Sequence, residues 1–258
     1  MTPRIHPTAI VSPDAVLGAD VEVGPHAIIG DRCVVGDGSV VAARAVLERD
    51  VLLGRNVKVG IGSVLGGDPQ DLKFRGEHTT VEIGDNTTIR EYTTINRGTS
   101  HSLKTSVGQN CFIMSYVHLG HDCQIGDNVI MSNGTQLAGH VIVENRAILS
   151  GLVAVHQFTK IGQFAFVGGC SRVAKDVPPF VKAVGNPIRL YGLNKVGLER
   201  NGFSPEVIRE LKRAYRLFFN SELNLSQARE RAAGELQAYP EVQDFLRFFE
   251  QSDRGVAI

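Results

Sequence analysis

The sequence predicts a mainly β protein, with a triangular parallel β-helix over residues 1–186 and a small α-helical domain over residues 187–258. A large aliphatic residue recurs at every sixth position through most of the chain. Two long segments interrupt this register without ending it, and beyond Val173 it gives way to helical spacing. A fixed short period is typical of repeat proteins, whose units stack on their neighbours.

The six-residue register begins near the N-terminus. It covers residues 5–65, 83–95 and 107–173. Glycine often follows the aliphatic residue, and a small or β-branched residue usually lies four positions after it. Each unit therefore predicts a short strand and a turn, with the large and the small residue both pointing inward. Three units make one coil of eighteen residues, and coils stack about 4.8 Å apart through parallel strand hydrogen bonds.

The two breaks in the register predict irregular loops at residues 66–80 and 97–106. A solenoid has few other places for irregular backbone, so binding residues are expected there. A plain surface excursion would look the same in the sequence.

The C-terminal part has helical spacing. Adjacent prolines, Pro178 and Pro179, cannot donate ladder hydrogen bonds and predict the end of the rod. Segment 204–220 begins with Ser-Pro, an N-cap followed by a first-turn proline, and its apolar residues share one face. Two further helices are expected near residues 226–238 and 241–251.

Composition excludes several kinds of partner. Lys plus Arg and Asp plus Glu are both 27, so no excess charge favours nucleic acid or an anionic membrane. No run approaches the roughly 18 apolar residues of a membrane span, and the repeat begins at once, without a signal peptide. The four cysteines form no CxxC pair and are expected to be reduced packing residues. These features predict a cytoplasmic protein without an integral membrane segment.

Four histidines lie in adjacent coils of the predicted rod: His118, His121, His140 and His156. At a spacing of eighteen, His121, Gly139 and Gln157 stack in one column, and Asp122 and His140 stack in the next. An imidazole can take a proton from a hydroxyl or an amine, and a glycine N–H can stabilise an oxyanion. The columns therefore predict an acid–base site. Two competing interpretations are that the histidines bind zinc, or that they lie in surface turns and bind nothing. No metal site is predicted.

Nine motifs occur in order along the chain: PQDLKFRGE (69–77), INRGT (95–99), HLGHDC (118–123), LAGH (137–140), VHQF (155–158), VGGCS (167–171), DVPPF (176–180), GNP (185–187) and GLNKVGLERNGFS (192–204). With them the chain resembles the UDP-N-acetylglucosamine acyltransferase family over both domains. The hexads alone are shared with many acetyltransferases, whereas the DLK and HxxHD motifs in this order are specific.

The resemblance implies a left-handed β-helix and a homotrimer with its active sites between subunits. It also implies the first step of lipid A biosynthesis, transfer of a 3-hydroxyacyl chain from acyl carrier protein to the 3-hydroxyl of UDP-N-acetylglucosamine. The acyl group arrives on the phosphopantetheine arm of the carrier, so no further cofactor is expected.

Site residues are assigned by the same resemblance. His121 would be the general base, Asp122 would orient it, and the Gly139 amide would stabilise the oxyanion. Further positions would contact the substrates: Asp71, Lys73, Asn96, His118, His140, His156, Gln157, Gly169, Asn194 and Arg200. Among these, Gly169 matches the position that limits acyl length in the family.

Three residues depart from the family pattern. Asn96 replaces a frequent histidine, and Val196 and Asn201 stand where many members have Glu and Arg. These departures leave open a 3-amino sugar nucleotide as acceptor, with an amide as product. Another hexapeptide acyltransferase using coenzyme A and a non-enzymatic scaffold are the remaining alternatives.

Two surface patterns point to protein partners. The helix at 204–220 carries a basic stripe, which consists of Arg209, Lys212, Arg213 and Arg216. This stripe would suit an acidic acyl carrier protein, or it is an ordinary solvated face.

Outward apolar columns are expected on two of the three sides of the rod, and Glu22 and Lys58 are expected on the third side. The columns are Phe112, Ile130, Ile148 and Phe166; Ile10, Ile28, Val46 and Val64; and Val16, Val34 and Leu52. Two apolar sides fit a closed trimer.

Overall fold

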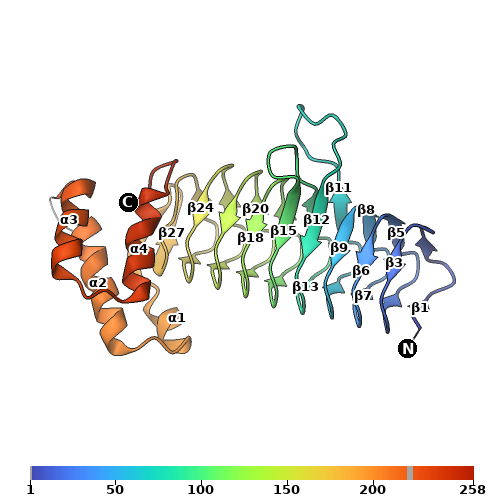
Figure 1. Cartoon of the computed structure of the whole chain (residues 1–258), viewed down its shortest axis with the longest axis horizontal. Helices are drawn as coiled ribbons and strands as arrows, with labels where there is room; N and C mark the ends of the chain where they lie inside the picture. The colour runs from blue at the N-terminus through green and yellow to red at the C-terminus, as the bar shows by residue number, and fades with distance from the viewer. Residues whose placement is uncertain (1, 220–222) are drawn as a thin grey trace.

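The computed structural model describes residues 2–219 and 223–258 as a long rod of stacked coils with helices at its C-terminal end (Figure 1). The rod is a parallel β-helix, as predicted, and its strands form three sheets. The first sheet contains β1 (Arg4–Ile5), β4 (Glu22–Val23), β7 (Val40–Val41), β10 (Lys58–Val59), β13 (Thr88–Ile89), β16 (Phe112–Ile113), β19 (Ile130–Met131), β22 (Ile148–Leu149), β25 (Phe166–Val167), β27 (Val181–Val184) and β28 (Arg189–Leu193).

The other two sheets complete the triangle. The second contains β2 (Ile10–Val11), β5 (Ile28–Asp31), β8 (Val46–Arg49), β11 (Val64–Gly67), β14 (Thr94–Asn96), β17 (His118–Leu119), β20 (Gln136–Leu137), β23 (Ala154–Val155) and β26 (Arg172–Val173). The third contains β3 (Val16–Leu17), β6 (Val34–Val35), β9 (Val51–Leu53), β12 (Thr80–Ile83), β15 (Lys104–Val107), β18 (Gln124–Ile125), β21 (Ile142–Val143) and β24 (Lys160–Ile161).

Each coil turns three corners. We call the first corner the one between the first and second sheets, the second corner the one between the second and third, and the third corner the one between the third and first. Most parallel strand pairs are offset by eighteen residues, as in Phe112 with Ile130, and the last pair, β25 with β27, is offset by sixteen. The offset widens only where loops intervene. Both loops, residues 68–79 and 97–103, leave the rod at the second corner, between β11 and β12 and between β14 and β15.

The core repeats the same inward pair in each coil. Leu119 and Cys123, for example, are fully buried. Burial of such a large aliphatic residue is the main stabilising term of the rod, and truncation to alanine typically costs about 2–5 kcal/mol. Burial also raises the pKa of the Cys111 thiol to about 11, so this cysteine is an inert packing residue, as predicted. Cys170 is exposed, so the expectation that all four cysteines pack inside is wrong for this one.

The double proline does not end the rod. Val177 bridges to Ile161, and β27 pairs with β25 in parallel, so the first sheet continues past Pro178 and Pro179. The antiparallel strand β28 then pairs with β27. The predicted boundary at residue 186 therefore falls between two paired strands. The prediction failed because each proline lacks only its own backbone N–H. The next strand, β27, begins after both prolines and pairs with β25 without those two N–H groups.

Four helices follow the sheet: α1 (Lys195–Arg200), α2 (Pro205–Phe219), α3 (Leu225–Glu235) and α4 (Pro240–Glu250). The last three match the predicted helices within three residues at each end, although residue 220 lies outside the described residues. Phenylalanines of α2 and α4 pack together, with ring centroids of Phe218 and Phe249 4.4 Å apart. No described helix has the length and apolarity needed to cross a membrane.

The outward apolar columns occupy all three sheets, which corrects the prediction of two. Phe112 lies on the first sheet, Ile10 on the second and Val16 on the third. Glu22 and Lys58 share the first sheet with Phe112, nearer the N-terminal end. Each sheet therefore carries outward apolar residues along only part of the length of the rod.

Candidate active site

The eighteen-residue period brings the predicted residues together at the second corner. His121 lies in the turn between β17 and β18, and His140 lies in the corresponding turn one coil later. The backbone N–H of His140 donates to the His121 carbonyl at 2.9 Å, and that of Phe158 donates to the Gly139 carbonyl at 3.2 Å. These bonds fix the turns one above the other, as the spacing predicted.

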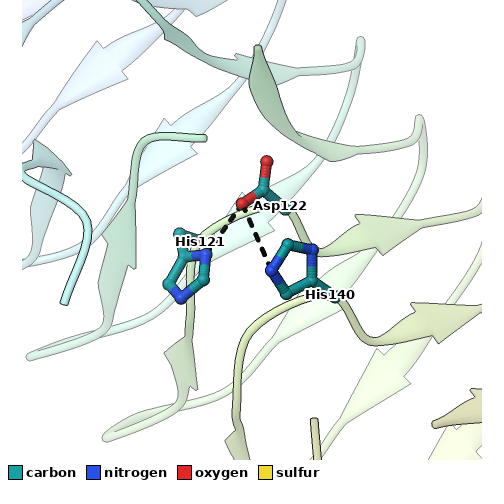
Figure 2. Close-up of side chains that lie close together, drawn as sticks. All are labelled: His121, Asp122 and His140. Carbon is teal, nitrogen blue, oxygen red and sulfur yellow. Dashed lines mark hydrogen bonds and ion pairs between the residues drawn. The ribbon is translucent and has the colours of Figure 1, made fainter. Parts of the chain in front are cut away.

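His121 and Asp122 form a hydrogen-bonded pair. Nδ1 of His121 lies 2.7 Å from Oδ2 of Asp122, and Nε2 of His140 lies 3.8 Å from the same oxygen (Figure 2). An ionised carboxylate can only accept, so Nδ1 of His121 carries the proton. The lone pair of Nε2 is then left free to accept a proton from a ligand.

The Asp122 carboxylate is almost fully buried, at 2% exposure. Burial alone would raise its pKa, but hydrogen bonds from Ser102, His121 and Thr99 outweigh burial and hold the pKa below its ordinary value. Asp122 therefore stays ionised at neutral pH and keeps the His121 ring in one tautomer.

Three rings surround the His140 imidazole. Phe158 stacks on it with centroids 4.2 Å apart, and His101 and His121 approach edge-on at 4.7 and 4.9 Å. Burial lowers the pKa of His140, and the nearby histidines lower it further against the opposing effect of Asp122. A neutral His140 can donate or accept a hydrogen bond without adding charge. Its Nδ1 is buried and has no hydrogen-bond partner among residues 2–219 and 223–258.

Gly139 lies directly against the His121 ring. A Cβ built on this glycine would fall 2.6 Å from Nε2 of His121, so a larger residue there would displace the His121 ring. Gly139 is buried, yet among the described residues its backbone N–H makes no hydrogen bond. Most buried backbone donors are paired, so this free N–H suggests a ligand-binding role.

The loop 68–79 forms the wall of a neighbouring pocket of about 230 Å³. Loop residues Asp71 and Lys73 face His101, His140 and Phe158 across it. The pocket thus combines a negatively charged and a positively charged side chain with aromatic surface, and it lies beside His121.

Two family models match the chain. The one described as "Udp N-acetylglucosamine O-acyltransferase; Domain 2" matches residues 176–257, and "Bacterial transferase hexapeptide (six repeats)" matches residues 104–139. The acyl-[acyl-carrier-protein]--UDP-N-acetylglucosamine O-acyltransferase of Myxococcus xanthus is 46% identical over 193 residues, 74% of this chain and 75% of that protein. The chain belongs to the UDP-N-acetylglucosamine O-acyltransferase family. Its Synechocystis relative of the same name is 42% identical over 196 residues, 75% of this chain and 71% of that protein.

Solved members of the family share the whole architecture. The UDP-N-acetylglucosamine acyltransferase from Bacteroides fragilis is 40% identical, with a TM-score of 0.96 over 98% of this chain and 100% of that chain. That from Acinetobacter baumannii is 37% identical, with a TM-score of 0.95 over 98% and 99%. The protein is therefore an acyltransferase, as predicted from its motifs.

The structure brings together only part of the predicted site of this acyltransferase. His156 and Gln157 lie exposed on the next coil at the second corner, and His118 lies on β17, bonded to Oγ1 of Thr94 through Nδ1 at 2.7 Å. Burial lowers the pKa of His118, with a further contribution from His121. Asn96 is buried beneath the loop 68–79, where its amide donates to the Asp68 carbonyl at 2.7 Å.

The remaining predicted residues of the acyltransferase lie at other corners. Gly169 is exposed at the first corner. Asn194 caps α1 and donates to the Phe164 carbonyl at the third corner, and Arg200 lies at the other end of the same helix. A single chain therefore does not collect all the residues assigned to one site.

A metal would fit this site poorly. Within the described part of the chain, His121, Asp122 and His140 offer ligand atoms within 4.8 Å of one another. However, the two Asp122 oxygens already accept hydrogen bonds from Thr99, Ser102 and His121. A metal would have to displace these donors, so the arrangement favours acid–base chemistry.

Sequence reasoning missed four residues of the acyltransferase site: Thr99, His101, Ser102 and Phe158. Phe158 continues the column of Asp122 and His140 at the same eighteen-residue spacing, so the period could have found it. His101 carried one signal, a histidine inside a predicted loop. The hydroxyl residues carried none, because their partners depend on how the loop 97–103 folds back.

Proposed function

We propose that this acyltransferase transfers a 3-hydroxyacyl chain from acyl carrier protein to the 3-hydroxyl of UDP-N-acetylglucosamine, the first step of lipid A biosynthesis. The names of its relatives support both substrates. The observation that carries the mechanism is the His121–Asp122 pair, which leaves Nε2 of His121 free as a general base.

The proposed reaction balances without another reactant. Nε2 of His121 takes the proton of the acceptor hydroxyl as its oxygen attacks the thioester carbonyl. The carbon–sulfur bond then breaks, and the imidazolium returns the proton to the departing thiolate of the phosphopantetheine arm. Asp122 stabilises the imidazolium, and no further cofactor is needed.

The free N–H of Gly139 is the proposed oxyanion donor. It lies beside the His121 ring, where the thioester carbonyl would have to approach. A preorganised backbone donor at such a position stabilises the tetrahedral intermediate more than the substrate.

The pocket beneath the loop 68–79 is the proposed binding site for the sugar nucleotide. Lys73 would contact the anionic diphosphate, and Asp71 and His140 would bind sugar hydroxyls. His118, His156 and Gln157 would extend this surface along the second corner. Asn96 is buried under the loop and is not among the described residues that line the pocket, so it would not contact the acceptor directly. We therefore favour a hydroxyl over an amine as the acceptor.

A homotrimer is proposed to complete each site. Gly169 would limit acyl length from the first corner of a neighbouring subunit, and Asn194 and Arg200 would contact the nucleotide from a third corner. The corners lie on different sides of one rod, so residues from separate corners can meet only between copies of the chain. We place the enzyme in the cytoplasm, which the four unpaired cysteines favour.

A thioester-consumption assay tests the proposed reaction. It uses 3-hydroxyacyl carrier protein and UDP-N-acetylglucosamine, and compares the wild type with His121→Ala. We expect turnover to fall by about 100-fold or more without the base. His6→Ala, remote from the site near the N-terminus, is the control. Equal turnover of wild type and His121→Ala would reject the mechanism, and faster turnover of the 3-amino analogue would identify an amide-forming enzyme.

A further inference from the structure

We infer that the loop 97–103 is a positioning element with two separable tasks, and that Arg97, Thr99 and Ser102 are its positioning residues. One part of the loop orients the carboxylate behind His121, and the other fixes the loop 68–79 over the sugar-nucleotide pocket. This inference rests on the proposed function.

The first task is performed on Asp122. Thr99 donates to it twice, from its backbone N–H to Oδ1 at 3.0 Å and from its hydroxyl to Oδ2 at 2.8 Å. Ser102 also donates twice, from its N–H at 3.2 Å and from its hydroxyl. Thr99 and Asp122 are buried, at 7% and 2% exposure. These donors fix both carboxylate oxygens, so Oδ2 faces Nδ1 of His121 in one orientation.

The second task is performed by Arg97, which is 3% exposed. Its Nε donates to the Gly66 carbonyl at 3.0 Å, and its guanidinium forms an ion pair with Asp68. The guanidinium also lies 5.7 Å from the centroid of the Phe74 ring. One buried side chain thus touches the start and the middle of the loop 68–79.

The far end of the loop 68–79 reaches the same cluster. His78 contacts the buried Asp50 through Nε2 at 3.0 Å, and Arg97 approaches Asp50 at 3.9 Å. Between these ends the loop bonds to itself, as in the N–H of Lys73 donating to Asp71 at 2.9 Å. Arg97 therefore determines where Asp71 and Lys73 lie relative to His140.

The two tasks predict different kinetic effects. Loss of the Thr99 hydroxyl disturbs Asp122 and His121, which act on the reaction, so kcat should fall with little change in KM. Loss of the Arg97 guanidinium moves the acceptor-binding loop, so KM for UDP-N-acetylglucosamine should rise. A residue needed only for folding would change neither parameter selectively.

Thr99→Val tests the first task, since valine keeps the shape and removes the hydroxyl. We expect kcat to fall roughly tenfold and the pKa of Asp122, followed by carbon-13 NMR, to rise toward its ordinary value. Thr99→Ser keeps the hydroxyl, so its kcat and its Asp122 pKa should match those of the wild type. Thr87→Val is the matched control, because Thr87 is also a buried threonine, and its hydroxyl donates to the Gly108 carbonyl away from the site. Ser102→Ala repeats the test should Thr99→Val fail to fold.

Arg97→Met tests the second task, and we expect KM for UDP-N-acetylglucosamine to rise roughly tenfold. Arg32→Met is its control, because Arg32 bonds to the same Asp50 carboxylate from the preceding coil, at 2.7 and 2.8 Å. Equal effects of Arg97→Met and Arg32→Met, or of Thr99→Val and Thr87→Val, would overturn the inference. A fully active His121→Ala would instead reject the proposed function.

Discussion

Asp122, His140 and Phe158 all have left-handed backbone, with φ of 60°, 61° and 61°. Such angles are uncommon outside glycine, but here they recur at the same place in successive turns. The chain bends from one sheet to the next at each corner through this one residue. Because its conformation is shared, its side chain leaves every coil in the same direction. The rod thereby aligns a carboxylate, an imidazole and a phenyl ring in a column beside His121.

Replacement of Asp122 by asparagine should impair catalysis more than it impairs folding. An amide can donate to Nδ1 of His121, which would place the proton on Nε2 and remove the base. We expect kcat to fall by about a thousandfold, with KM little changed. Steady-state kinetics and circular dichroism of the variant check this. A variant that keeps wild-type kcat would show that the tautomer is set by another group.

The lowered pKa of Asp122 also links stability to pH. A carboxyl whose folded pKa lies below its unfolded value stabilises the fold above the unfolded pKa, and this contribution is lost as pH falls through the folded value. The stability difference between wild type and Asp122→Asn should therefore be largest near pH 7 and shrink below about pH 4. Urea unfolding at several pH values measures it. A difference independent of pH would contradict the assignment.

His101 is a further residue whose role can be measured. Its ring lies 4.7 Å from that of His140 and lines the pocket with Lys73. His101→Ala should weaken acceptor binding by about 0.5–1.5 kcal/mol, seen as a few-fold higher KM with unchanged kcat. His26→Ala, on an earlier coil, is the control. Unchanged KM would place His101 outside the acceptor site.

Contact with the His121 ring, and not the position in the turn, explains why Gly139 should not tolerate replacement. Gly139 and Gly151 occupy the same position in turns at different corners, two residues after a buried leucine. A Cβ at 139 would meet Nε2 of His121 at 2.6 Å, whereas a Cβ at 151 would meet its nearest neighbour at 3.4 Å. Gly139→Ala should abolish turnover in a folded protein, and Gly151→Ala should be active. Thioester assays and melting curves of both variants decide, and an active Gly139→Ala would show that catalysis does not depend on the close contact between residue 139 and the His121 ring.

Periodicity determined how much of each element could be predicted. Strands, turns and the columns of residues at the second corner follow from one repeated spacing, which depends only on side-chain size and glycine. The helix at 204–220 followed from its apolar face and its N-cap. By contrast, α1 is six residues long and contains Gly197, so it shows no helical period, although its cap Asn194 was a usable signal. The contacts of Thr99 and Arg97 depend on the path of the irregular loops, which no period describes.

The basic stripe on α2 is only partly available for a partner. Arg213 donates to the buried Glu210 at 2.9 Å and to the Glu235 carbonyl, so it holds α2 against α3. The docking surface we propose for acyl carrier protein therefore consists of Arg209, Lys212 and Arg216, all exposed. This narrows the predicted stripe to three cations.

Charge reversal tests this docking surface. Arg209→Glu combined with Arg216→Glu should raise KM for acyl carrier protein about tenfold at low salt, with a smaller effect at high salt. Arg231→Glu on α3 reverses one exposed charge beside the proposed surface and is the control. An unchanged KM at low salt would reject the docking surface.

The whole rod carries apolar residues on all three faces. Ile10 on the second sheet and Val16 on the third are 65% and 61% exposed. Ile28 and Val34, one coil further along these two columns, are also exposed, and the remaining column residues are half-buried. Apolar residues stacked in this way suggest contact with further copies of the chain, and two contacts per rod are what a closed trimer requires. Light scattering should give about three times the 28.0 kDa chain mass. A monomer mass at micromolar concentration would exclude the trimer.

Mixed trimers test whether each site spans two subunits. His121 lies at the second corner and Arg200 beside the third, so one proposed site would take His121 from one copy and Arg200 from the next. His121→Ala and Arg200→Ala trimers should each be nearly inactive. When the two chains are co-expressed in equal amounts, about one quarter of the sites should receive both intact residues and regain turnover. If one chain supplied both residues, every site would carry one defect. Mixing would then restore nothing.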